Sequence, residues 1–167
     1  MLFLHFLEST VMNRKKKTNL LDELGTAIGV GLLAGLAGTA AITLSQMIEM
    51  KITGRKPSTT PEKAVERTLD IGAVSKEKKG KVAQEVHWVY GTTWGIARGL
   101  MRFAGLKGWP ATLTHFSAVW GTALVMLPAL GLSKPIREQK IKKTLIEATH
   151  HAVYAAATGL VVDAIEG

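Results

Sequence analysis

The sequence predicts an all-α integral membrane protein in which four helices cross the bilayer as a bundle. Three observations predict this fold class. The stretch Leu24–Ile48 contains no Asp, Glu, Lys, Arg or His, and a helix needs only about 20 mainly apolar residues to cross the hydrocarbon core. Three further apolar blocks follow. The segments between blocks are polar and basic, which is typical of anchoring at anionic lipid headgroups.

Composition excludes several classes of protein. The 167 residues leave room for one domain. The absence of cysteine excludes disulfides, thiolate catalysis and Cys-based metal sites. A formal net charge of +8 is compatible with nucleic-acid binding, but the basic residues flank apolar blocks instead of forming one patch. We therefore expect the lipid bilayer, and no nucleic acid, as the partner.

Residues 1–23 are predicted to form a basic, interfacial N-terminal segment that precedes a membrane domain at 24–165. The apolar run at 1–12 is too short to span, and it either lies at the interface or precedes a true start at Met12. A cationic stretch before an apolar one also resembles a signal peptide. Here, however, the apolar part is about twice the usual length of a signal's apolar region, which favours a retained anchor.

Small residues recur at helical spacing in the first apolar block. Each glycine would cost a soluble helix about 1 kcal/mol relative to Ala, whereas in lipid a glycine face lets a second backbone approach closely. We expect this face to pack against another helix, either within the chain or in a larger membrane complex. Its members are Gly25, Gly29, Gly31, Gly35 and Gly38.

A polar connector is predicted over residues 49–81. Thr60 as N-cap, with Pro61 at the first helical position, begins a short helix there. Ala64, Val65, Thr68 and Leu69 share one face of that helix, while Glu62, Lys63, Glu66 and Arg67 point elsewhere. The helix is expected to lie on the membrane surface; a solvated connector is the alternative.

The other three apolar blocks are Val82–Leu106, Trp109–Leu132 and Thr144–Ile165. The link at Gly105–Gly108 is so short that the first two of these must form a helical hairpin. Val82–Leu106 and Thr144–Ile165 carry charged residues. A charge at a helix centre costs about 2.5–3.5 kcal/mol on insertion scales. We therefore expect their polar faces to point into the bundle.

A faint internal repeat indicates a duplicated helix pair. The segment from His87 to Gly95 is similar to the segment from His151 to Gly159, and Gly38-Thr39-Ala40 is similar to Gly121-Thr122-Ala123. Such a repeat relates two-span units by an axis normal to the membrane. Chance similarity between common membrane residues is the competing explanation.

Most of the 21 Lys and Arg residues lie in the segments 49–81 and 133–143. The positive-inside rule then places both of these loops in the cytoplasm and both termini outside. The basic cluster Arg14–Lys17 argues for the opposite orientation.

Helical register at about 1.5 Å per residue sorts the polar residues of the blocks into two layers. Arg98 and Asp163 fall at matching depth toward one face, with His115, and are predicted to form an ion pair. Snorkelling of Arg98 to the near surface is the alternative. The other layer lies toward the two long loops and, besides Ser45, contains Gln46, Glu49, Glu85, His87, Tyr90, Glu147, His150, His151 and Tyr154.

Three interpretations compete for this second layer. It holds the helices in register through hydrogen bonds, it passes or senses protons or cations, or it binds haem or a divalent metal. Glu147 and His150 have the Glu-x-x-His spacing of di-iron bundles, but Glu85 and His87 are two residues apart and so on different faces. For haem, His87 and His151 are candidate axial ligands, with Gly91 and Gly95 leaving room for the macrocycle. We expect no cofactor.

Several short motifs carry a resemblance over roughly residues 24–165. They are Ser45-Gln46, the connector Arg55-Lys56-Pro57-Ser58-Thr59-Thr60-Pro61, His87-Trp88-Val89-Tyr90-Gly91, His115-Phe116, Val119-Trp120-Gly121 and His150-His151-Ala152-Val153-Tyr154. This layout resembles the YagU-like family of small bacterial inner-membrane proteins, whose function is uncharacterised. The resemblance implies a helical, multi-pass inner-membrane protein and no activity.

The sequence contains no nucleophile–base pattern, Walker loop or dinucleotide fingerprint. We therefore expect a non-enzymatic membrane protein that passes or senses protons or cations. The alternatives are a b-type haem or metal protein, and an accessory subunit of a homo-oligomer or larger membrane complex.

Overall fold

The computed structural model describes residues 2–68, 75 and 77–166, and the side chains of these from Asn19 onward. Leu69 and the side chains of Arg14–Lys17 therefore lie outside the described residues. Over the described residues the secondary structure is helical, which confirms the all-α prediction. The elements are α1 (Leu2–Thr53), α2 (Thr60–Thr68), α3 (Lys79–Phe103), α4 (Gly108–Ala129), a 3₁₀ turn η1 (Ile136–Glu138) and α5 (Ile141–Glu166).

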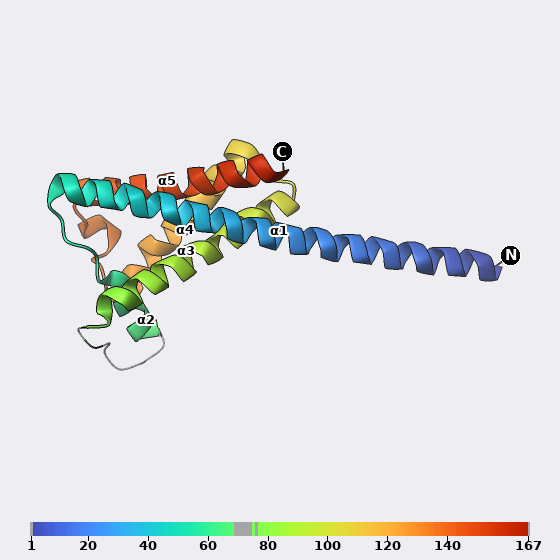
Figure 1. Ribbon diagram of the computed structural model, residues 1–167, viewed down its shortest axis with the longest axis horizontal. Coiled ribbons are helices and arrows are strands. Elements are labelled where there is room, and N and C mark those ends of the chain that lie inside the picture. The colour runs from blue at the N-terminus through green and yellow to red at the C-terminus, as the bar shows by residue number, and fades with distance from the viewer. Residues whose placement is uncertain (1, 69–74, 76, 167) are drawn as a thin grey trace.

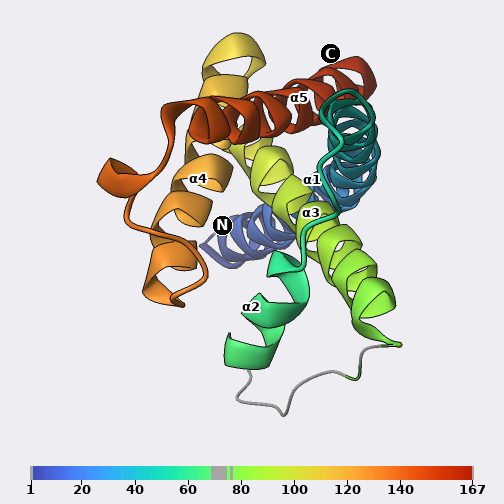
Figure 2. The same ribbon diagram turned by 90° about the vertical axis from the view of Figure 1, so that its left-hand side faces the viewer.

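The helices α1, α3, α4 and α5 form a bundle (Figures 1 and 2). α1 packs on α3 and α5, and α4 packs on the same two helices. α3 and α5 run in one direction and α1 and α4 in the other, and α2 packs against α3 at one end. We call that end, where α1 and α4 finish and α3 and α5 begin, the pocket end. The opposite end is the ion-pair end.

α1 is one continuous helix that includes the N-terminal segment predicted to be separate. At about 1.5 Å per residue it is about 80 Å long, more than twice the roughly 30 Å hydrocarbon core of a bilayer. Its N-terminal part projects beyond the ion-pair end, away from the other helices (Figure 1). Within it, Asn19–Thr53 is the one segment of the described residues that is long and apolar enough by itself to cross a membrane.

Glycines allow α1 and α3 to approach backbone to backbone. A Cβ built on Gly31 would lie 2.7 Å from the carbonyl oxygen of Gly95, and one on Gly35 would overlap the Thr92 carbonyl. Gly99, one turn further along α3, likewise meets the Ala27 carbonyl. The predicted close approach at Gly31 and Gly35 is therefore present, and its partner surface is the Gly-x-x-x-Gly pattern of α3.

The predicted glycine face includes two residues that do not belong to it. A Cβ on Gly25 or Gly29 would meet no atom within 4 Å, so neither glycine contributes to packing. Gly38 does pack, but against Tyr154 and Thr158 of α5 instead of α3. Gly25 precedes the first turn of α1 that meets α3, at Ala27, and Gly29 lies on the exposed side of the helix within the crossing.

The interior of the bundle combines small and aliphatic side chains with several polar ones, whereas many large aliphatic side chains lie on its exterior. The largest fully buried side chains include Arg98, His115 and Thr39. Large aliphatic side chains point outward on every bundle helix. Examples are Leu33, Leu36 and Leu44 on α1, Val89 and Leu100 on α3, Leu113 and Val125 on α4, and Leu145 and Leu160 on α5. A water-soluble bundle usually buries more of its large aliphatic side chains.

The connector helix is present but faces differently from the prediction. Its first backbone bond joins the Lys63 N–H to the Thr59 carbonyl, so the helix begins one residue earlier than expected. Glu62, predicted to point away from the apolar face, is fully buried, and Arg67 donates to the Leu130 carbonyl. Because α2 packs on the bundle at this end, its contact face is set by α3 and α4 and not by its own apolar residues.

The helical hairpin of α3 and α4 is confirmed. Gly105 and Gly108 in its short loop have φ values of +87° and +57°, which are rare for residues with a side chain. Residues that correspond in the proposed helix-pair repeat do not lie in similar environments in the structure. Tyr154 is 2% exposed and Tyr90 is 41% exposed, and a Cβ on Gly121, unlike one on Gly38, would meet nothing within 4 Å.

Candidate functional site

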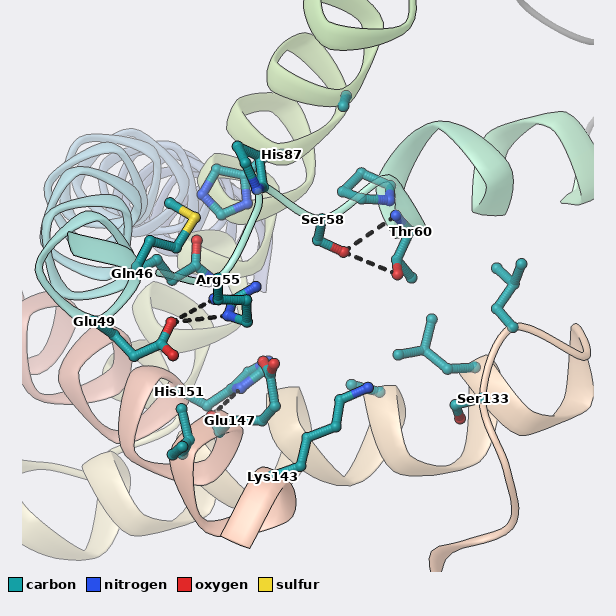
Figure 3. A pocket seen from close by; sticks show the side chains of 18 of the residues that line it. Gln46, Glu49, Arg55, Ser58, Thr60, His87, Ser133, Lys143, Glu147 and His151 are labelled. Carbon is teal, nitrogen blue, oxygen red and sulfur yellow. Dashed lines mark hydrogen bonds and ion pairs between the residues drawn. The ribbon is translucent and has the colours of Figure 1, made fainter. Parts of the chain in front are cut away.

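A pocket of about 610 Å³ lies at the pocket end of the bundle. Residues from α1, α3, α4, α5, the start of α2 and both long loops line it (Figure 3). Five residues of the predicted polar layer are brought together here. They are Gln46, Glu49, His87, Glu147 and His151.

The two histidines of the pocket are held in fixed orientations by hydrogen bonds. Thr43 donates to the Thr39 carbonyl at 2.6 Å, so at the 3.1 Å contact between Thr43 Oγ1 and His87 Nε2 the imidazole must be the donor. His151 Nδ1 lies 2.7 Å from the Glu147 carbonyl, which only accepts, so Nδ1 carries the proton. Each ring therefore has one nitrogen committed to a structural bond.

Just outside the pocket, two more residues of the layer join helices. His150 Nδ1 lies 2.8 Å from Ser45 Oγ and links α5 to α1. Tyr154 donates to the Gly91 carbonyl at 2.6 Å and links α5 to α3. These contacts match the structural interpretation of the layer.

Two residues of the predicted layer do not point inward. Glu85 is on the outer face of α3, where its carboxylate is 61% exposed and pairs with Lys81. Tyr90 lies edge-on to Trp94 at the surface. The depth of both residues was predicted from register, but their azimuth around α3 is set by the glycine face that packs on α1.

The mouth of the pocket is cationic. Two carboxylates, Glu49 and Glu147, also line it. Glu49 accepts from Arg55 at 2.7 and 2.9 Å, and this carboxylate raises the pKa of Arg55. The basic residues that line the pocket are Arg55, Lys56, Lys140, Lys142 and Lys143.

The N-terminus of α5 adds to the positive potential. Lys140 and Lys142 at the start of α5 line the pocket. The first N–H groups of a helix have no intrahelical partner and carry a partial positive charge. Thr60 and Pro61 at the start of α2 also line the pocket, but the Thr60 N–H donates to Ser58 Oγ at 3.2 Å and Pro61 has no N–H. Basic side chains and the N-terminus of α5 together make a site that attracts anions.

The sequence did not predict these basic residues as a site. Arg55 and Lys56 belong to the loop after α1, and Lys140–Lys143 begin α5. In the sequence they are typical of anchors beside apolar blocks, and the two groups are separated by about half of the chain. The sequence did contain a signal for this site, because the end of one helix and the start of an antiparallel neighbour lie at the same end of a bundle.

At the ion-pair end, Arg98 and Asp163 form the predicted ion pair. Arg98 Nη2 lies 2.8 Å from Asp163 Oδ1, and the Arg98 side chain is 0% exposed while that of Asp163 is 35% exposed. A second pair, which the sequence reasoning missed, joins Arg102 Nε to Glu166 Oε2 at 3.2 Å. The signal was present, because Arg102 is one turn after Arg98 and Glu166 one turn after Asp163.

Nearby, His115 is fully buried between α3 and α5. Its Nε2 donates to the Trp94 carbonyl at 3.0 Å, and its ring lies 5.5 Å from that of Tyr154. His115 thus joins α4 to the other two helices. It belongs to the packing of the bundle and does not line the pocket.

The arrangement does not fit the haem interpretation. The space that a macrocycle would need beside Gly91 and Gly95 is filled by Thr39 and Gly35 of α1. For a metal, the Glu147–His150 pair would need further ligands. Among the described residues, no group of three or more His, Asp or Glu side chains is placed to hold a metal ion.

Comparisons with known proteins find no match, whether with a family model, a curated protein or a solved structure. The resemblance to the YagU-like family therefore stays a prediction.

Proposed function

We propose that the chain is a four-span integral membrane protein that binds an anionic ligand in the pocket. The first part of the proposal is supported by the apolar exterior of the bundle. Large aliphatic side chains stand outside while Arg98, His115 and Thr39 are fully buried. Lipid is the solvent in which such a surface is stable.

Only the α1 segment meets the length and composition requirement by itself. In the proposal α3 and α5 span with their charges turned inward. Arg98 pairs with Asp163 and Arg102 with Glu166, which lowers the cost of placing each charge in the membrane. The same charges make α3 and α5 too polar to be identified as membrane spans when each helix is taken by itself.

The second part of the proposal rests on one observation, the cationic lining of the pocket. None of its lysines forms a salt bridge among the described residues, and Glu49 is already bound to Arg55. A cation entering this mouth meets repulsion from Lys140, Lys142 and Lys143, whereas an anion is attracted. By the positive-inside rule, this end faces the cytoplasm of a bacterial inner membrane.

The proposal is tested by the melting temperature of the detergent-solubilised protein with pyrophosphate, glycerol 3-phosphate and oleate, against choline at equal ionic strength. A ligand that binds only the folded state raises the melting temperature. At least one anion should do so for the parent and for Lys63→Gln/Lys134→Gln, whose two lysines are exposed at the same end and do not line the pocket. The effect should disappear in Lys142→Gln/Lys143→Gln. Equal shifts in all three proteins would show that the pocket is not an anion site.

Proton or cation passage is a second candidate, because buried and half-buried polar residues continue from the pocket toward the ion-pair end. They are His87, Thr39, Tyr154, Thr158, His115 and Arg98. In proteoliposomes, His87→Ala/His151→Ala should then abolish a pH-dependent flux that the parent shows. A flux equal to that of the parent would remove this candidate.

A further inference from the structure

The pocket changes in character between its mouth and its inner part. The mouth carries Lys140, Lys142 and Lys143 at the start of α5. Further inside, one face of α4 forms an apolar wall, to which Met47 and Met50 of α1 add from the other side. The wall consists of Trp120, Ala123, Leu124 and Leu127.

The pocket is also deeper than a small anion requires. Thr43, which lines it, lies ten residues before the end of α1 at Thr53, which corresponds to about 15 Å along the helix. Trp120 on α4 lies at a similar depth from the end of that helix at Ala129. The volume of about 610 Å³ lies within the roughly 300–1,000 Å³ typical of sites for drug-sized molecules. A phosphate ion alone would leave the apolar wall uncovered.

We infer that the ligand is an anionic phospholipid. Its phosphate lies among Lys140, Lys142 and Lys143, and part of an acyl chain covers the apolar wall of α4. This inference rests on the proposed function, in which the helix ends around the mouth lie at the headgroup level of the bilayer. The shared chemistry is a phosphate ester, which a soluble ester such as glycerol 3-phosphate also supplies.

Binding is measured on the full chain in neutral detergent by native mass spectrometry. The probes are phosphatidate, phosphatidylcholine and glycerol 3-phosphate. Phosphatidate should bind at least tenfold more tightly than either of the other two, a ratio that corresponds to about 1.4 kcal/mol. Lys142→Gln/Lys143→Gln should lose about tenfold in phosphatidate affinity, whereas the matched Lys63→Gln/Lys134→Gln should keep it.

A substitution in the wall separates the acyl chain from the phosphate. Leu124→Ser should weaken phosphatidate binding several-fold without changing glycerol 3-phosphate binding. Leu113→Ser is the control, because Leu113 is exposed on α4 away from the pocket. All of these side chains are exposed or half-buried, so the variants are expected to fold.

Three results would overturn the inference. If glycerol 3-phosphate binds as tightly as phosphatidate, the pocket takes a soluble anion, and only the lipid assignment fails. If phosphatidate binds equally to the parent and to both lysine variants, the lipid is merely annular. If no phosphate ester binds the parent in either this or the melting experiment, the anion pocket itself is wrong.

Discussion

At the scale of single residues, the strongest constraint is the ion pair of Arg98 and Asp163. Arg98 is fully buried, and its Nε and Nη1 have no hydrogen-bond partner among the described residues. Asp163 is therefore the one carboxylate shown to compensate a buried guanidinium. Removing one partner of a buried pair costs about 3–5 kcal/mol, whereas replacing both is often close to neutral.

Asp163→Asn should accordingly destabilise the protein by about 3 kcal/mol or more, because it leaves the Arg98 charge buried and uncompensated. Arg98→Met should cost less, since Asp163 is 35% exposed and can be solvated. The double variant Arg98→Met/Asp163→Asn should recover part of the loss. The free energy of unfolding, measured by denaturation in mixed micelles, checks this order.

The exposed pair of Arg137 and Glu138 is the control for this series. Their side chains are 85% and 53% exposed at a separation of 4.0 Å, and such pairs contribute about 0–1 kcal/mol. Glu138→Gln should therefore change stability little. If Asp163→Asn is equally mild, the buried pair does not hold α3 to α5.

At the scale of elements, the contact between α1 and α3 decides how the bundle is assembled. The two helices meet through Gly31 and Gly35 on one side and Gly95 and Gly99 on the other. Close approach lets the backbones themselves pack, which large side chains would prevent. Everything at the pocket end is positioned by where these two helices cross.

Gly35→Ala should destabilise the protein by about 1–3 kcal/mol, because the new methyl overlaps the Thr92 carbonyl and the helices must separate. Gly29→Ala is its matched control on the same helix. A Cβ there meets nothing within 4 Å, so the better helix propensity of Ala should leave stability unchanged or raise it by about 1 kcal/mol. The free energy of unfolding of the two variants, measured in parallel, checks this difference. Equal effects of the two substitutions would argue against the backbone contact between α1 and α3.

At the scale of the whole molecule, the orientation of the chain in the membrane can be mapped with single introduced cysteines, because the sequence contains no cysteine. The four-span arrangement predicts that Ser58 and Lys134 at the pocket end lie on one side of the membrane and Lys107 at the ion-pair end on the other. Single-cysteine variants at these positions, treated with an impermeant thiol reagent on intact cells and on inverted vesicles, should react in that pattern. Labelling of all three from the same side would rule out the four spans.

The sequence also predicted much of the fold at this scale, through signals that are local. The helix over Leu24–Ile48 and the short link at Gly105–Gly108 follow from composition and spacing alone. The Arg98–Asp163 pair followed from depth, because rise per residue is the same in every α-helix. The predictions that were wrong concern the direction in which a residue faces around its helix axis. Glu85 and Gly29 were assigned to inner faces that the crossing of α1 and α3 turns outward.

The sequence by itself therefore determined that the chain is helical, where the bundle helices lie apart from the N-terminal part of α1, and that Arg98 and Asp163 stand at one depth. Only the tertiary structure decided which side of each helix faces its neighbours, and so which residues form the pocket. Arg55, Lys56, Lys140, Lys142 and Lys143 are far apart in the chain, and they meet because α1 ends where the antiparallel α5 begins. Depth is a property of one helix, whereas a shared site depends on the packing of several.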